Sequence, residues 1–344
     1  MSFTSGSFPK HMQLFLALLI TITVLRVSAA GQGNETTTST PRLPLATAAR
    51  PANVPAGYVI TPFGYFHSSC VQVLKAGERM LADHRVQRAD GSIEASIASC
   101  VYPHFTPTGT SVSLTAPQTG NTSRSSTAES PEVNGWVENT NVTTGSPSSS
   151  YGALVARWTV PPRPRGEDGQ VLFFFPGLED INDQQTSILQ PVLGLYGSQW
   201  TIASWNCCLS GIVVSSPAVN VEPGDRIYGS MTNTCPTGTL SCATWNVLSL
   251  DLSTGQSTVL ADTPSDGQVF NWAFGGVLEA YYVVRCDDYP PDRSLTFDDV
   301  TLFDQNLRLV HDPRWSSGAG AGSGISPQCG YGVSAEARRV NLRF

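Results

Sequence analysis

Residues 171–180 read VLFFFPGLED, and residues 185–190 read QTSILQ. The first segment is the most apolar strand-like run in the chain, and a Pro-Gly pair interrupts it, which predicts a buried strand followed by a turn. The second segment predicts another strand. Because side chains alternate along a strand, Gln190 shares a face with the apolar Ile188 and Val192. Gln190 is therefore either the polar member of a core face or a group directed into a cleft.

The rest of the chain repeats this pattern of strand and turn. Among its 344 residues are 31 Gly and 24 Pro, and only 14% are charged. This composition favours strands and turns over long helices. Roughly a dozen short apolar segments, separated by turn residues, follow from residue 153 onward, which predicts an all-β domain built as a sandwich or a barrel.

The N-terminus has the features of a secretory signal. Residues 1–29 contain a short apolar run followed by small residues, which is typical of a signal peptide. The run is shorter than the roughly 20 residues that span a bilayer. Residues 30–56 are rich in Thr, Pro and Ala without periodicity, which predicts a linker. We therefore expect a secreted, extracellular protein that has no membrane segment once the signal is removed.

A small ordered segment precedes the large domain. Residues 57–106 predict a compact module, and residues 107–150 predict a Ser/Thr-rich linker that contains or adjoins a processing site. Residues 133–137 (VNGWV) are the exception within that linker, and the large domain could begin there. Otherwise it is expected to span residues 151–344.

Eight cysteines, an even number, predict up to four disulfides in an oxidising compartment. A bond between Cys70 and Cys100 would staple the small module, which is too small to hold a large core alone. We expect the adjacent Cys207 and Cys208 to have different partners. The remaining candidates are Cys235, Cys242, Cys286 and Cys329.

Other sequence features restrict the partners of the protein. The glycosylation acceptors Asn34, Asn121 and Asn141 agree with secretion. No cysteine pair has CxxC spacing and the five histidines do not cluster beside the cysteines, so no metal site or cofactor is predicted. The net charge of −7 provides no basic surface for nucleic acid. We expect a monomer.

Carboxylate and amide side chains are the remaining candidates for chemistry. The large domain has a single histidine, His311, and no Gly-x-Ser-x-Gly motif, which argues against an enzyme with a Ser-His or Cys-His pair. Glu279 interrupts the apolar run VLEAYYVV at residues 277–284. Burying a carboxylate there is costly unless it is hydrogen-bonded or protonated. The alternative is that Glu279 lies on an outward face and is solvated.

Six segments, in order, resemble the glutamic peptidase family (eqolisins, peptidase family G1). They are VARWTVP, FPGLE, QTSILQ, VEPGDRI, DLSTGQ and NWAFGGVLE, at residues 155–161, 175–179, 185–190, 221–227, 251–256 and 271–279. The resemblance covers roughly residues 153–303. It implies a concanavalin A-like β-sandwich of two antiparallel sheets and an acid endopeptidase with a Gln/Glu dyad, here Gln190 and Glu279, acting on polypeptide substrates.

The same resemblance implies roles for three further residues, and two alternative functions on this fold are left open. Phe175, Glu179 and Trp205 would support or bind the substrate, although Phe175 replaces a tryptophan of the family, and the segment around Ser204 lacks a carboxylate that the family has. The module at residues 57–106 has no clear counterpart in that resemblance, and we expect it to be a propeptide that covers the cleft until acid releases it. One alternative is a glycoside hydrolase that uses Glu179 with Glu279. Another is a non-catalytic lectin or secreted binding protein on the same fold.

Overall fold

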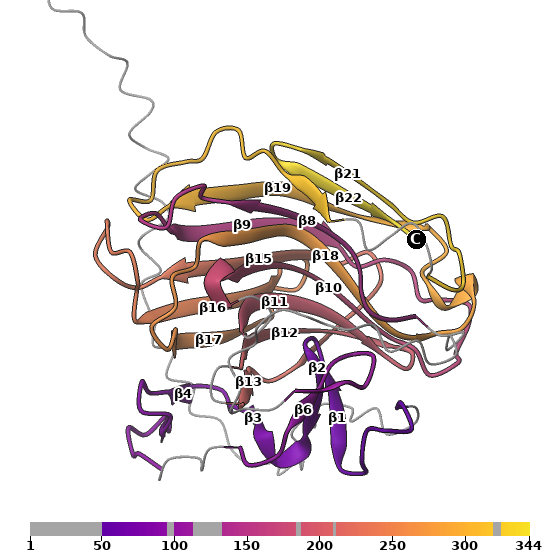
Figure 1. The fold of residues 1–344 in the computed structure, drawn as a ribbon, viewed down its shortest axis with the longest axis horizontal. Coiled ribbons are helices and arrows are strands. Elements are labelled where there is room, and N and C mark those ends of the chain that lie inside the picture. Colours follow the sequence, from indigo (N-terminus) through magenta and orange to yellow (C-terminus); the bar gives the residue numbers. More distant parts are fainter. Residues whose placement is uncertain (1–49, 95–99, 113–132, 184–186, 209–210, 319–324) are drawn as a thin grey trace, which may run out of the picture. The chain divides into compact units, whose positions relative to one another are not determined.

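The computed structural model describes residues 50–94, 100–112, 133–183, 187–208, 211–318 and 325–344 (Figure 1). The chain divides into residues 1–40 and a compact unit of residues 41–344. The predicted signal peptide, Asn34 and Asn121 lie outside the described residues. Within the described ranges, regular structure consists of strands and three short 3-10 helices, at Ser68–Cys70, Ile181–Asp183 and Cys286–Asp288. No helix among these residues is long and apolar enough to cross a membrane.

One large sheet of nine strands carries most of the quoted segments. Its strand order is β20-β8-β18-β10-β11-β12-β13-β3, and β14 pairs with β12. All of its pairs are antiparallel except β13 with β3. The strands are β20 (Ser316–Gly318), β8 (Val133–Thr143), β18 (Trp272–Val283), β10 (Val171–Glu179), β11 (Ile188–Tyr196), β12 (Gln199–Cys207), β13 (Val213–Ser215), β14 (Val219–Val221) and β3 (Val71–Val73).

A second sheet of seven strands packs against the first. Its order is β17-β16-β15-β9-β19-β22-β21, and the core cluster between the sheets includes Leu193 of β11, Val247 of β16 and Phe297 of β19. Two sheets facing each other across one core make an all-β sandwich, as predicted. The strands are β17 (Ser257–Pro264), β16 (Thr244–Asp251), β15 (Arg226–Asn233), β9 (Tyr151–Thr159), β19 (Ser294–Asp304), β22 (Arg339–Arg343) and β21 (Gly332–Glu336).

Strand β10 is buried on both of its faces. Leu172, Phe174 and Leu178 belong to the core between the two sheets. Phe173 and Phe175 belong to a second apolar cluster on the opposite face of the nine-stranded sheet. The continuous apolar run at residues 171–175 therefore follows from burial on both sides.

The N-terminal residues cover that opposite face. They form a small sheet with the order β1-β2-β6-β7 and a hairpin of β4 with β5, while β3 joins the nine-stranded sheet (Figure 1). Tyr58, Tyr65 and Phe66 share the second apolar cluster with β10, β11 and β18. The strands are β1 (Tyr58–Thr61), β2 (Gly64–His67), β4 (Arg79–Met80), β5 (Val86–Gln87), β6 (His104–Phe105) and β7 (Ser111–Val112).

The structure differs from the predicted strand boundaries in three places. Strand β10 continues through Gly177 with a shift in register instead of ending there. Strand β18 runs as one long strand across Gly275 and Gly276, longer than the short segments predicted. A Cβ atom at Gly276 would lie 2.6 Å from the Phe297 ring, so this glycine permits close packing of the sheets. Strand β8 pairs with β18, so the sandwich begins at Val133, inside the segment predicted as a linker.

All eight cysteines are paired. The bond between Cys70 and Cys100 is present, as predicted. The expectation of different partners for Cys207 and Cys208 is wrong, since these two residues bond to each other. Six cysteines pair among themselves, which leaves only this adjacent pair. The remaining bonds are Cys235–Cys242 and Cys286–Cys329.

Candidate active site

Gln190 and Glu279 lie on the two strands that flank β10, on the same face of the nine-stranded sheet. Gln190 is in β11 and Glu279 in β18. The residues two positions before and after each of them belong to the second apolar cluster, so both side chains point toward the N-terminal module. Both residues are 0% exposed. The alternative of a solvated, outward-facing Glu279 is therefore wrong for this arrangement.

The tip of the β1–β2 hairpin contacts Gln190. Thr61 pairs with Gly64 in the hairpin, so Pro62 and Phe63 form a two-residue turn. The side-chain amide nitrogen of Gln190, Nε2, donates a hydrogen bond to the backbone carbonyl oxygen of Pro62 at 2.9 Å. The side-chain amide of Gln190, a residue of the predicted dyad, therefore already binds a peptide carbonyl group of the hairpin.

Glu279 is connected to the same turn through Tyr281. The Tyr281 hydroxyl lies 2.5 Å from Glu279 Oε1 and 3.2 Å from the backbone carbonyl oxygen of Thr61. Thr61 and Pro62 are consecutive. Tyr281 therefore contacts the carbonyl group of one hairpin residue, and Gln190 contacts the carbonyl group of the next. The strand register places Glu279 opposite Phe173 of β10 and Gln190 next to Leu189, the partner of Leu178, so the two side chains reach this turn from positions about 13 Å apart along the sheet.

One oxygen atom on each side chain forms no hydrogen bond of good geometry with the described residues, although the Trp136 indole also interacts with the Glu279 carboxyl group. The two atoms are Gln190 Oε1 and Glu279 Oε2, and both are buried. Buried polar atoms without partners are uncommon, and they are frequent at functional sites, where the partner is a substrate or a water molecule. Both atoms belong to the two residues that the sequence nominates for chemistry.

Burial strongly affects the ionisation of Glu279. It raises the pKa of this carboxyl group to about 8, while contacts with the Tyr281 hydroxyl and the Trp136 indole act in the opposite direction by less. With the hairpin in place, Glu279 is thus protonated at neutral pH. If hydration restores the ordinary value of 4.5 when the hairpin leaves, closure takes up a proton. Closure is then favoured most below about pH 4.5 and is weakened as the pH rises toward 8.

This linkage predicts a pH-dependent stability of the intact chain. Between about pH 5 and about pH 9, the midpoint of thermal unfolding should fall more in the wild type than in Glu279→Gln, which has no carboxyl group to ionise at this position. Differential scanning calorimetry of both proteins measures the difference. Equal pH dependence in the two proteins would contradict the assignment of a raised pKa to Glu279.

The other residues nominated by the sequence lie at different distances from this pair. Trp205 pairs in register with Gln190 on the neighbouring strand, and Phe175 packs edge-on against Trp136 with ring centroids 5.8 Å apart. Both belong to the second apolar cluster. Glu179 is also fully buried, but it lies at the far end of β10.

The position of Glu179 excludes it as a glycosidase partner of Glu279. Glu179 lies opposite Trp272 on β18, seven residues from Glu279 along that strand. At about 3.3 Å per residue, the two backbones are roughly 20 Å apart. A pair of glycosidase carboxyl groups is separated by about 5 to 10 Å. The proposed glycoside hydrolase pair is therefore not formed.

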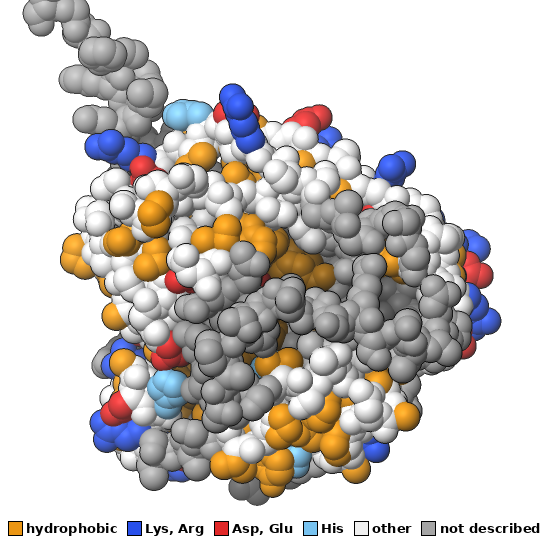
Figure 2. All heavy atoms as spheres, in the orientation of Figure 1, with side chains coloured by type: hydrophobic (Ala, Val, Ile, Leu, Met, Phe, Trp, Pro, Cys, Tyr) orange, Lys and Arg blue, Asp and Glu red, His pale blue; other side chains and the backbone are white. Residues whose placement is uncertain are grey.

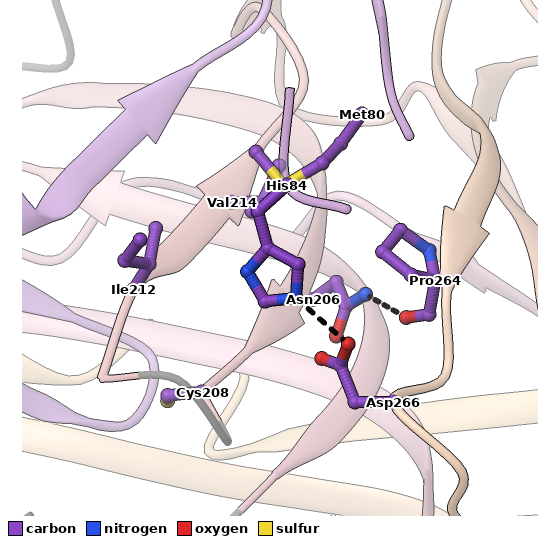
Figure 3. Close-up of a pocket in the computed structure, with 8 residues that line it drawn as sticks. All are labelled: Met80, His84, Asn206, Cys208, Ile212, Val214, Pro264 and Asp266. Atoms are coloured by element: carbon purple, nitrogen blue, oxygen red, sulfur yellow. Dashed lines mark hydrogen bonds and ion pairs between the residues drawn. The ribbon is translucent and has the colours of Figure 1, made fainter. Parts of the chain in front are cut away.

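Two ion pairs lie on the seam between the β4–β5 hairpin and the sandwich. Arg79 contacts Asp262 at 2.9 Å, and His84 contacts Asp266 at 2.9 Å. Figure 3 shows the second pair at a small pocket, beside the hydrogen bond of Asn206 to the Pro264 carbonyl. These contacts hold the N-terminal residues at a place separate from Gln190 and Glu279.

Charged side chains indicate no other site. On the face shown in Figure 2, Lys and Arg side chains are scattered singly and form no basic patch. Among the described residues, no group of three or more His, Cys, Asp or Glu side chains could hold a metal ion. Asn141 is half-buried, and its side-chain oxygen accepts a hydrogen bond from the Trp272 indole at 3.1 Å. Glycosylation at Asn141 stays a prediction.

The sequence did not nominate Tyr281 or Trp136 for the site. Tyr281 lies two residues after Glu279, so strand periodicity places it on the same face. Trp136 lies opposite Glu279 on β8, and its strand begins in a segment whose Thr and Asn content resembles a linker. The spacing of Tyr281 from Glu279 in the sequence was enough to nominate Tyr281, whereas Trp136 could be nominated only from the pairing of β8 with β18.

The fold and the site define a class: an all-β sandwich protein that carries a buried amide and carboxyl pair on one sheet, covered by a peptide hairpin. No protein-family model matches the chain, and no curated protein matches it in sequence.

Solved structures of peptidases resemble the fold. Scytalido-glutamic peptidase with a peptide-based transition state analog has 17% sequence identity and a TM-score of 0.44, covering 61% of this chain and 98% of that one. SCP-B, a member of the eqolisin family of peptidases in a complex with the tripeptide Ala-Ile-His, has 17% identity and a TM-score of 0.42 over the same shares. Aspergilloglutamic peptidase from Aspergillus niger has 14% identity and a TM-score of 0.35, covering 51% and 98%. At these values the likeness assigns no activity to this chain.

Proposed function

We propose that this protein is a secreted acid endopeptidase, made as a zymogen, that hydrolyses peptide bonds with Glu279 and Gln190. The observation that carries the proposal is the hydrogen bond from the Gln190 amide to the Pro62 carbonyl. Gln190 binds a peptide carbonyl of the hairpin, and Glu279 is linked to the preceding carbonyl through the Tyr281 hydroxyl. Substrate carbonyl groups would occupy this place once the hairpin has left.

The residue types suit direct attack by water. Ionised Glu279 takes a proton from a water molecule, whose oxygen forms a bond to the carbonyl carbon of the substrate. The Gln190 amide donates a hydrogen bond to the oxyanion of the tetrahedral intermediate. The bond from carbon to nitrogen then breaks, and protonated Glu279 returns the proton to the leaving amine. No covalent bond to the enzyme forms in this sequence.

The hairpin explains why the chain would be inactive as synthesised. It fills the place of the substrate, and the burial that it imposes keeps Glu279 protonated, which removes the base. Removing the N-terminal module would expose the second apolar cluster and hydrate Glu279. Substrates with apolar or aromatic side chains suit a face lined by Phe173, Phe175 and Trp205.

Acid release of the module requires groups other than Glu279, because protonation of Glu279 favours closure. The charged contacts of the module on the β4–β5 seam are those of Arg79 with Asp262 and of His84 with Asp266. The Arg79–Asp262 pair is about two-fifths exposed, so its contribution is small. We therefore propose that chain cleavage, rather than ion-pair loss alone, is the decisive step.

The position of the cut can be predicted from the pairing of β8. A cut that leaves the sandwich intact must precede Val133, where β8 begins. Acidification of the purified precursor should therefore yield a fragment that starts between residues 108 and 132, identified by N-terminal sequencing. A stable full-length product that is fully active would contradict the zymogen proposal.

A further inference from the structure

Tyr281 has contacts that the two-residue dyad does not explain. Its hydroxyl lies 2.5 Å from Glu279 Oε1 and 3.2 Å from the Thr61 carbonyl oxygen. Tyr281 is 0% exposed, and its ring packs edge-on against Tyr65 with centroids 5.6 Å apart. One hydroxyl group therefore contacts both the Glu279 carboxyl group and a backbone carbonyl group of the bound hairpin.

The Tyr281 hydroxyl has a single proton to donate, so its hydrogen bonds depend on whether Glu279 is protonated. A tyrosine hydroxyl donates one hydrogen bond and accepts others. When Glu279 is protonated, it can donate to the Tyr281 oxygen, and the hydroxyl proton is then free for the Thr61 carbonyl. When Glu279 is ionised, the hydroxyl donates to Oε1 instead, because a hydrogen bond to a charged acceptor is the stronger one. The second arrangement fixes Oε1 and leaves Oε2 for the attacking water.

We propose that Tyr281 is a positioning residue of this site: its hydroxyl orients the Glu279 carboxyl group and holds the backbone of the bound polypeptide one residue before the carbonyl that Gln190 holds. The inference rests on the proposed function for the identity of the bound chain as a substrate. The site thus recognises the backbone of two consecutive residues, which suits an unfolded polypeptide rather than a single side chain.

The test uses the unprocessed full chain, in which no hydrolysis is needed. Tyr281→Phe keeps the ring and removes the hydroxyl. The matched control is Tyr196→Phe, since Tyr196 is buried in the same apolar cluster and faces Glu279 but forms no hydrogen bond with it among the described residues. The titratable groups that face the Glu279–Tyr281 pair are Tyr65 from β2 and Tyr196 from β11.

The first readout is the titration of Glu279, followed by carbon-13 NMR of labelled glutamate and assigned by its loss in Glu279→Gln. Losing a hydrogen bond that favours the ionised form should raise the titration midpoint by about one to two pH units in Tyr281→Phe. Tyr196→Phe should leave it unchanged. An unchanged midpoint in Tyr281→Phe would overturn the orienting role.

The second readout is amide hydrogen exchange across residues 58–67. Tyr281→Phe should speed exchange at the hairpin turn by about 2- to 10-fold, the effect of one net hydrogen bond, and Tyr196→Phe should not. Exchange equal to that of the wild type would overturn the contact to the bound backbone. If the wild type cleaves no substrate after processing while both readouts change, the peptidase proposal fails and the role of Tyr281 stands.

Discussion

Replacing Glu279 with glutamine should lower kcat for hydrolysis of a denatured protein by about 10²- to 10⁴-fold, the usual contribution of a general base. Gln190→Ala should lower it by about 10²- to 10³-fold, because one donor to the oxyanion is removed. Both residues are enclosed by apolar neighbours, and Glu279→Gln preserves the shape of the side chain. The fold should therefore persist, which near-ultraviolet circular dichroism of the purified variants can verify.

The matched control for the glutamate is Glu138→Gln. Glu138 lies on the neighbouring strand β8, is also 0% exposed, and burial raises its pKa to about 8 as well. It bonds the backbone N–H of Gly332 rather than any group of the site. The activity of this variant should remain within a few-fold of the wild type. If Glu279→Gln kept full activity, or if both variants lost activity equally, the assignment of Glu279 as the base would be wrong.

Gly64→Ala should open the hairpin in the uncleaved chain. Gly64 has φ +106°, and a Cβ atom there would collide with the carbonyl oxygen of Phe105 on β6. Strain of this kind costs about 1 to 3 kcal/mol, which corresponds to an approximately 5- to 150-fold larger population of the open hairpin. Proteolysis of the hairpin by chymotrypsin, which cuts after its aromatic residues, and hydrolysis by the uncleaved chain, should both rise accordingly.

The matched control is Gly91→Ala, which introduces backbone strain at a positive φ without a collision with another strand. Gly91 also has a positive φ, +85°, but a Cβ atom added there would meet no other atom within 4 Å. It lies in the turn after β5, away from Gln190. Gly91→Ala should leave hairpin proteolysis and activity near the wild-type values. Equal behaviour of the two variants would show that the hairpin does not control access to the site.

The core of the fold could be predicted because strand periodicity is a local property. The alternation around Gln190 and the apolar run at residues 171–175 both predicted strands that are present. The reason for Gly276 in β18 is the close approach of Phe297 from the other sheet, a contact between distant segments that no local pattern encodes. Most of strand β8 was missed since its Asn and Thr residues resemble a linker.

The site could be predicted in part. Gln190 and Glu279 each interrupt an apolar strand, and the resemblance to glutamic peptidases nominated them as a dyad; the structure buries both on one face. The contact of Gln190 with Pro62 joins residues 128 positions apart, and no pattern near either residue encodes it. The raised pKa of Glu279 depends on burial beneath this distant hairpin, so the effect of pH on closure emerges only from the structure.

The most direct test of the proposed activity is hydrolysis of a denatured protein by the purified, processed chain from about pH 2 to about pH 7, with and without pepstatin and beside Glu279→Gln. We expect cleavage at acid pH that pepstatin does not inhibit and that Glu279→Gln abolishes. A folded and processed protein that cleaves nothing at any pH would contradict the proposal, and would favour the alternative of a secreted binding protein.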